Sequence, residues 1–148
     1  MYIRELSTVY QEYKRCIYML IRNRTNVYDF NFHVVIVTKY RKKLFNTQEY
    51  VNDIKKILYH LARKINVSIE RLEIMPDYVH LMLSFPPKYA PSEIVKNLKG
   101  SSARLWFKQH PETKKQLYGG HLWSPSFFIS TIGNISKQTV NEYVESQM

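Results

Sequence analysis

Residues 67–85 read Val-Ser-Ile-Glu-Arg-Leu-Glu-Ile-Met, then Pro-Asp, then Tyr-Val-His-Leu-Met-Leu-Ser-Phe. The two apolar-rich runs are short strand candidates, and the Pro76-Asp77 pair between them is typical of a tight turn. We therefore predict an antiparallel pair of strands over residues 67–75 and 78–85. The rest of the topology follows from what precedes and follows this hairpin.

A strand and a helix are predicted before the hairpin. From Tyr28 to Val37 the apolar residues first alternate with polar ones and then become continuous, which predicts a strand partly buried on both faces. A basic connector then leads to Thr47, a candidate N-cap. The helix that follows carries an apolar stripe from Val51 to Ile65.

After the hairpin, the sequence predicts another helix, a fourth strand and a last helix. Pro91 begins a helix that Pro111 ends, and residues 127–132 read as a fourth strand after the turn at Gly119-Gly120. Ser136 is the candidate cap of a last helix. With right-handed crossovers, the order β-α-β-β-α-β predicts an α+β, ferredoxin-like antiparallel sheet with two helices on one face, plus N-terminal and C-terminal helices.

Residues 1–27 are predicted to be an amphipathic helical extension of a domain that covers residues 28–148. Within it, residues 1–25 suit a helix, because apolar residues recur at intervals of three and four from Ile3 to Leu20. Basic residues crowd its second half, so this helix could contact a second copy, DNA or its own domain.

The composition indicates a globular protein with an anionic partner. The chain has 22 Lys and Arg against 12 Asp and Glu, a net charge of +10 on 148 residues, and 45% hydrophobic residues argue against disorder. The single cysteine, Cys16, cannot form an internal disulfide. No apolar run approaches the roughly 20 residues that cross a bilayer. We expect a soluble cytoplasmic protein without a membrane partner.

Two groups of side chains could carry chemistry. On the second strand of the hairpin, Tyr78 and His80 share a face, because side chains repeat every second residue. In the last helix, Tyr143 and Gln147 are four residues apart and so project from one face. A tyrosine can attack phosphorus and a glutamine oxygen can bind a hard cation, although either group alone is more often structural.

Together these segments resemble the HUH single-tyrosine transposases (TnpA) of the insertion-sequence 200/605 family. Residues 75–83, Met-Pro-Asp-Tyr-Val-His-Leu-Met-Leu, are similar to the family's Met-Pro-Asp-His-Val-His-Leu strand. Further matches follow in the family's order at residues 94–104, 119–126, 130–133 and 143–147. The resemblance covers residues 28–148.

The resemblance implies cleavage and rejoining of single-stranded DNA at hairpins near the ends of an insertion sequence. Carried over by position, Tyr143 would be the nucleophile, forming a 5′-phosphotyrosine link and a free 3′-OH. His80 and Gln147 would bind Mg²⁺ or Mn²⁺. The resemblance also implies a homodimer, in which the nucleophile helix of one subunit can complete the site of the other.

Tyr78 stands where the family has its first strand histidine, and a phenol is a poorer metal ligand than an imidazole. Three possibilities are open. The Tyr78 oxygen could still bind a hard ion; Asp77 or His121 could substitute; or the chain could bind DNA hairpins as a regulator without cutting them.

The basic surplus suggests phosphate-contacting residues, for which the candidates are Arg41, Lys42, Lys43, Lys99 and Arg104. The same charge would allow an RNA-binding ferredoxin-like module. Against that alternative, the predicted strands lack the glycine-flanked aromatic motif with which RNA-recognition modules stack bases.

Overall fold

The computed structural model describes residues 21–22, 27–28, 31–131 and 137–147. Its main feature is a four-stranded antiparallel sheet with the strand order β4-β5-β3-β6. In order along the chain these strands are β3 (Asn31–Val37), β4 (Ser68–Ile74), β5 (Tyr78–Ser84) and β6 (Phe128–Ser130). This is the predicted ferredoxin-like order, and the α+β fold class is confirmed.

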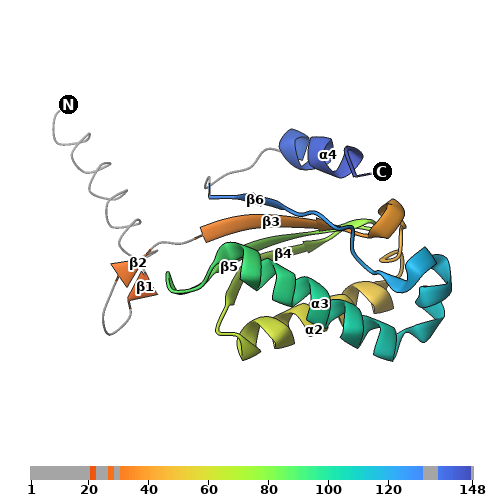
Figure 1. Ribbon diagram of the computed structural model, residues 1–148, viewed down its shortest axis with the longest axis horizontal. Helices are drawn as coiled ribbons and strands as arrows, with labels where there is room; N and C mark the ends of the chain where they lie inside the picture. The colour runs from red at the N-terminus through yellow and green to blue at the C-terminus, as the bar shows by residue number, and fades with distance from the viewer. Residues whose placement is uncertain (1–20, 23–26, 29–30, 132–136, 148) are drawn as a thin grey trace.

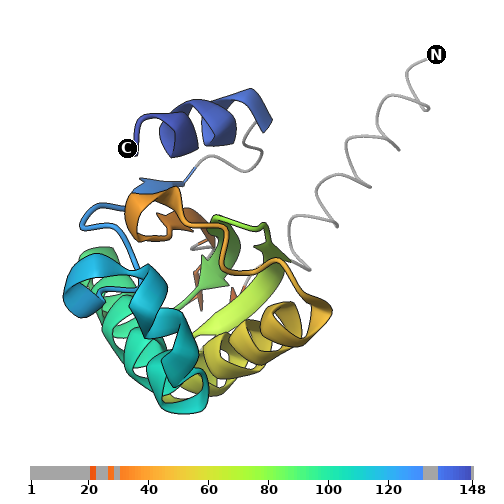
Figure 2. The ribbon, with the colours of Figure 1, turned by 90° about the vertical axis from the view of Figure 1, so that its right-hand side faces the viewer.

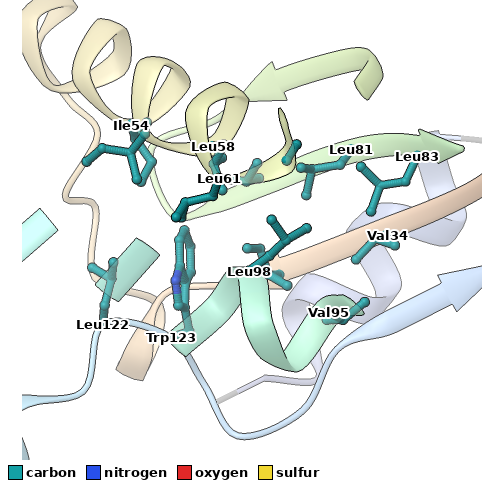
Figure 3. Close-up of a cluster of buried hydrophobic side chains, with 14 of the residues drawn as sticks. Val34, Ile54, Leu58, Leu61, Leu81, Leu83, Val95, Leu98, Leu122 and Trp123 are labelled. Atoms are coloured by element: carbon teal, nitrogen blue, oxygen red, sulfur yellow. The ribbon is translucent and has the colours of Figure 1, made fainter. Parts of the chain in front are cut away.

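The helices α2 (Gln48–Lys64) and α3 (Pro91–Gln109) cover one face of the sheet (Figure 1). As predicted, Thr47 caps α2, with its hydroxyl oxygen accepting from the backbone N–H of Tyr50 at 3.2 Å. Leu58 and Leu61 of α2 join Leu98 of α3 over the sheet in the main core (Figure 3). Three short 3-10 segments lie in the connections: Lys39–Arg41 after β3, and Pro111–Gln116 and Tyr118–Gly120 after α3.

The last helix, α4 (Lys137–Glu145), lies on the opposite face of the sheet, as Figures 1 and 2 show. Its Val140 and Val144 pack against Val35 and Val37 of β3 in a small cluster separate from the main core. We call this side of the sheet the α4 face. None of the described helices is long and apolar enough to cross a membrane.

The predicted hairpin is confirmed with its turn at Pro76-Asp77. The backbone N–H of Met75 donates to the carbonyl of Tyr78 at 2.9 Å, which closes a two-residue loop. The backbone N–H of Thr38 donates to the carbonyl of Asp77 at 2.9 Å, so the turn is also tied to the end of β3. This places the start of β5 in a fixed position beside the central strand.

The N-terminal prediction was wrong where the structure describes that segment. β1 (Ile21–Arg22) pairs antiparallel with β2 (Val27–Tyr28), so residues 21–22 are not helical and Tyr28 is not part of β3. The physical reason is that backbone hydrogen bonds to residues 27–28 replace helical ones at this point. The rest of the predicted helix, residues 1–20, lies outside the described residues, as does Ser136, the predicted cap of α4.

Candidate functional site

The register of the sheet brings a second histidine next to His80. On the α4 face, His80 of β5 stands opposite Val35 of β3, and His33 lies one diagonal position further along β3. The Nδ1 atom of His33 is 3.1 Å from the Nε2 atom of His80, and the ring centroids are 5.3 Å apart. His33 is buried, with 3% of its surface exposed. The two imidazoles therefore contact each other on the α4 face of the sheet, between β3 and β5.

A carboxylate completes this cluster on the edge strand. Glu73 of β4 stands opposite His80, and its Oε2 atom is 3.5 Å from His80 Nδ1. Burial lowers the pKa of His80, although Glu73 acts in the opposite direction. The imidazole is therefore neutral at pH 7, which is the form that binds metals. The order Glu73, His80, His33 runs across three neighbouring strands.

An open pocket of about 570 Å³ lies beside these groups. Tyr78, His80 and Glu73 line it, together with Lys55, Arg71 and Val140 among others. Arg71 is exposed on the edge strand, two residues from Glu73 and on the same face of β4. A cationic rim beside a neutral histidine is suited to a phosphate group.

Tyr78 shares a face of the sheet with His80, as predicted, and this is the α4 face. Its surroundings disfavour a phenolate. Burial raises the pKa of Tyr78 most, and the carboxylates of Asp77 and Glu73 raise it further. The phenol therefore stays protonated at neutral pH. Its oxygen is consequently a weak ligand for a divalent ion.

The two substitutes considered from the sequence are engaged elsewhere. Asp77 forms an ion pair with Arg41, at 3.5 Å between Oδ2 and Nε. His121 lines a different pocket, of about 360 Å³, between α3 and residues 120–125. The structure therefore places neither side chain with His80 in the pocket beside β5.

Tyr143 and Gln147 come together as predicted, through a serine that the sequence reasoning missed. The hydroxyls of Tyr143 and Ser126 are 3.0 Å apart, and Ser126 Oγ donates to Gln147 Oε1 at 2.6 Å. Because the serine has one hydrogen, Tyr143 is then the donor to Ser126. One detail was wrong: α4 ends at Glu145, so Gln147 lies beyond the helix and reaches Ser126 from the turn after it.

The site is thus divided into two parts. Tyr143 packs on Phe128 of β6, whereas His80 lies on β5, and β3 lies between these strands. Strands two positions apart in a sheet are separated by about 10 Å. Among the described residues, no hydrogen bond joins Tyr143 or Gln147 to His80. The same described residues also contain no group of three His, Cys, Asp or Glu side chains that could hold a metal ion.

The candidate phosphate-contacting residues differ in their availability. Lys42, Lys43 and Arg104 are exposed, whereas Arg41 is paired with Asp77. Lys99 is directed inward, and its ammonium donates to three successive carbonyls, those of Ser124 at 2.7 Å, Pro125 at 3.3 Å and Ser126 at 3.1 Å. An ammonium has three hydrogens to donate, so these carbonyls use all of them. Lys99 therefore supports the segment that carries Ser126.

Lys99→Met should lower the free energy of unfolding by about 2 kcal/mol, because three hydrogen bonds from a charged donor are lost, one of them the partly buried bond to the Ser124 carbonyl. Chemical denaturation monitored by circular dichroism measures this change. Lys96→Met is the matched control, since Lys96 is exposed on the same helix and should change stability by less than about 0.5 kcal/mol. Equal stabilities of the two variants would contradict the supporting role of Lys99.

An open ferredoxin-like sheet, with a histidine on β5 and a helix that carries a tyrosine on the same face, is the arrangement that the resemblance to the insertion-sequence transposases implies. The chain belongs to the IS200-like transposase family, because the family model described as "Transposase IS200 like" matches residues 26–147. The recognition made from the sequence is confirmed.

Individual relatives agree with this assignment. The chain is 37% identical over 126 residues to the ISDra2 transposase TnpA of Deinococcus radiodurans, covering 85% of this chain and 89% of that protein. It is 26% identical over 117 residues to the transposase for insertion sequence element IS200 of Salmonella typhimurium, covering 79% and 76% of the two chains.

Solved structures show the same fold. A crystal structure of a Deinococcus radiodurans R1 protein superposes with a TM-score of 0.79 at 35% identity, covering 86% of this chain and 97% of that one. A REP-associated tyrosine transposase bound to a REP hairpin has a TM-score of 0.52 at 15% identity, covering 84% and 68% of the chains. The second likeness concerns the fold alone.

Proposed function

We propose that this transposase cleaves and rejoins single-stranded DNA at insertion-sequence ends through a 5′-phosphotyrosine intermediate on Tyr143. The observation that supports the proposal most is the placement of Tyr143 and Gln147 on the same sheet face as His80, each held by the same serine. A tyrosine nucleophile and metal-binding side chains on one open face suit phosphoryl transfer to a DNA strand.

Tyr143 has the chemistry that the reaction needs. Its phenol oxygen would form a bond to the scissile phosphorus as the bond to the 3′ oxygen breaks. The phenol proton would pass to water or a base, and the departing 3′ oxygen would take a proton from water to become the free 3′-OH. The ester keeps the phosphoryl group activated, so a 3′-OH can later displace the tyrosine without a nucleotide cofactor. Ser126, which accepts the phenol hydrogen bond in this arrangement, holds the nucleophile in place before the reaction.

The donor set on the α4 face fits a hard divalent ion in part. Bound Mg²⁺ or Mn²⁺ would polarise the scissile phosphate and offset the charge that develops on its oxygens. His80 would supply a neutral nitrogen and Gln147 an amide oxygen, both of which suit such ions. Tyr78, as a neutral phenol, contributes little in comparison.

The two parts of the site must meet for cleavage. Tyr143 and Gln147 are both hydrogen-bonded to Ser126 beside β6, whereas His80 lies on β5, whose backbone is about 10 Å from that of β6. A shift of α4, or a second copy that supplies its own helix, would bring the two groups onto one phosphate. The cluster that holds α4 consists of Val140 and Val144 on Val35 and Val37, with three aromatic rings at its edge, and it is much smaller than the main core. Release of α4 therefore costs less than unfolding of that core. A homodimer that exchanges these helices would satisfy the geometry.

The proposed DNA partner is a single-stranded hairpin at the end of the mobile element. The net charge of +10, the exposed Lys42, Lys43 and Arg104, and the basic rim of Arg71 and Lys55 suit a phosphate backbone. Hairpin binding by a fold neighbour is consistent with this partner.

A second candidate is a regulator that binds the hairpin without cutting it. The neutral phenol of Tyr78 at the position of a metal ligand favours this reading. Membership in a transposase family gives no support to an RNA-binding module.

One experiment distinguishes cleavage from binding. The full chain is incubated with a labelled single-stranded hairpin from its own element's end and Mn²⁺, and a denaturing gel is searched for a covalent adduct. We expect an adduct that requires metal and disappears with a chelator. Tight hairpin binding without an adduct, with Mg²⁺ or Mn²⁺ at saturation, would establish the regulator instead.

The rate of adduct formation should rise about tenfold per pH unit between pH 7 and 9, at fixed metal concentration. Burial raises the pKa of Tyr143 above its ordinary value. The reactive phenolate is therefore scarce and increases with pH in proportion to hydroxide. The lowered pKa of His80 keeps that ligand neutral throughout the range. A flat profile in single-turnover gels would contradict the expectation.

A further inference from the structure

The pairing of His33 with His80 has no role in the mechanism above, yet at 3.1 Å it is closer than the contact of His80 with Glu73 at 3.5 Å. We propose that His33 Nδ1 and His80 Nε2 bind the divalent ion together, so that His33 supplies the imidazole absent from position 78. This inference rests on the proposed metal-dependent function and assigns its ligands in this chain.

The distance between the two nitrogens suits this role. Two ligand atoms about 2.1–2.2 Å from one ion, at the roughly 90° angle of octahedral coordination, are about 3.0–3.1 Å apart. The observed separation of His33 Nδ1 and His80 Nε2 is 3.1 Å. The same separation suits an N–H···N hydrogen bond, in which His33 Nδ1 carries the proton when His80 is protonated on Nδ1. To bind the ion, His33 would move this proton to its Nε2 atom, and both rings would turn until their lone pairs converge on the ion.

Glu73 favours the tautomer of His80 that this arrangement requires. A carboxylate near Nδ1 holds the ring proton there and leaves the lone pair of Nε2 directed at His33. Carboxylates behind metal-binding histidines orient the ring and make it a stronger ligand. Glu73 comes from the edge strand and His33 from the central strand, so His80 is oriented from both sides.

The position of His33 in the fold also favours it over Tyr78. β3 is hydrogen-bonded to β5 on one side and to β6 on the other, and His33 is paired in register with both neighbours. A buried side chain on a central strand loses little further freedom when it binds an ion. Tyr78, at the start of β5, offers only a neutral phenol.

The test is Mn²⁺ affinity of the full chain without DNA, measured by electron paramagnetic resonance. We expect His33→Gln and His33→Ala to bind Mn²⁺ at least tenfold more weakly than the unmodified chain. Tyr78→Phe should stay within about twofold. His60→Ala is the matched control, because His60 is an exposed histidine on α2, and it should not change the affinity. Folded His33 variants with unchanged affinity would overturn the proposal, as would a tenfold loss in Tyr78→Phe.

A second measurement covers the case in which His33 variants fail to fold. Electron spin echo modulation of Mn²⁺ on the unmodified chain counts the imidazole nitrogens bound to the ion. Two imidazole nitrogens are expected, and one or none would overturn the inference. The covalent-adduct assay is independent of this count. Two nitrogens without an adduct would disprove the proposed cleavage alone, whereas an adduct with only one nitrogen would disprove the role of His33 alone.

Discussion

Tyr143→Phe should lower the rate of covalent adduct formation with the hairpin at least about a thousandfold. Its affinity for the hairpin should stay within about twofold of that of the unmodified chain. The substitution removes only the oxygen that would attack phosphorus. The phenylalanine ring can keep the contact with Phe128, whose centroid is 5.6 Å away, and the only hydrogen bond lost is the one to Ser126. The free energy of unfolding should therefore fall by no more than about 1 kcal/mol.

The adduct is measured on a denaturing gel, and hairpin affinity by an equilibrium binding assay on the same preparations. Tyr59→Phe is the matched control, because Tyr59 is 46% exposed on α2 and lies on the helix-covered side of the sheet. It should form the adduct at the unmodified rate. An adduct that persists in Tyr143→Phe would show that a different side chain attacks, and peptide mapping would then identify it.

The sequence was sufficient to predict the sheet because its signals are local. The Pro76-Asp77 turn fixes the hairpin within two residues, and the cap at Thr47 fixes the start of α2. Apolar stripes then specify which helix face meets the sheet. Residues 21–22 and 28 were mispredicted because the apolar spacing typical of a helix runs up to residue 20, and spacing alone does not show where a helix ends.

The site was predicted less completely because its contacts join residues that are distant in the chain. Alternation on β3 shows that His33 is polar among apolar neighbours, but the 47-residue separation from His80 is bridged only by the register of two strands. Glu73 could have been found, since a two-residue turn at 76–77 sets it opposite His80. Ser126 lies in an irregular segment, for which the sequence offers no periodicity.

Tyr78→His should raise Mn²⁺ affinity on the order of 10- to 100-fold, the range over which single residues around a metal site change its affinity. Positions 78 and 80 project from the same face of β5, so the new imidazole would stand about 7 Å along the strand from His80, within reach of a shared ion. It would also replace a phenol that stays neutral at physiological pH. The adduct should form faster at metal concentrations below saturation.

Affinity and rate must be separated to interpret this gain. Tyr78→Phe is the control for loss of the phenol, and it should show no gain in either the Mn²⁺ affinity or the cleavage rate.

If His33 already supplies the second nitrogen, Tyr78→His should accelerate cleavage at low Mn²⁺ but leave the rate at saturating Mn²⁺ nearly unchanged, because the ion is then bound in both proteins. The double variant His33→Gln with Tyr78→His should bind Mn²⁺ about as well as the unmodified chain, since each protein has two imidazoles for the ion. A Tyr78→His variant that folds normally and gains no affinity would contradict the view that position 78 limits metal binding.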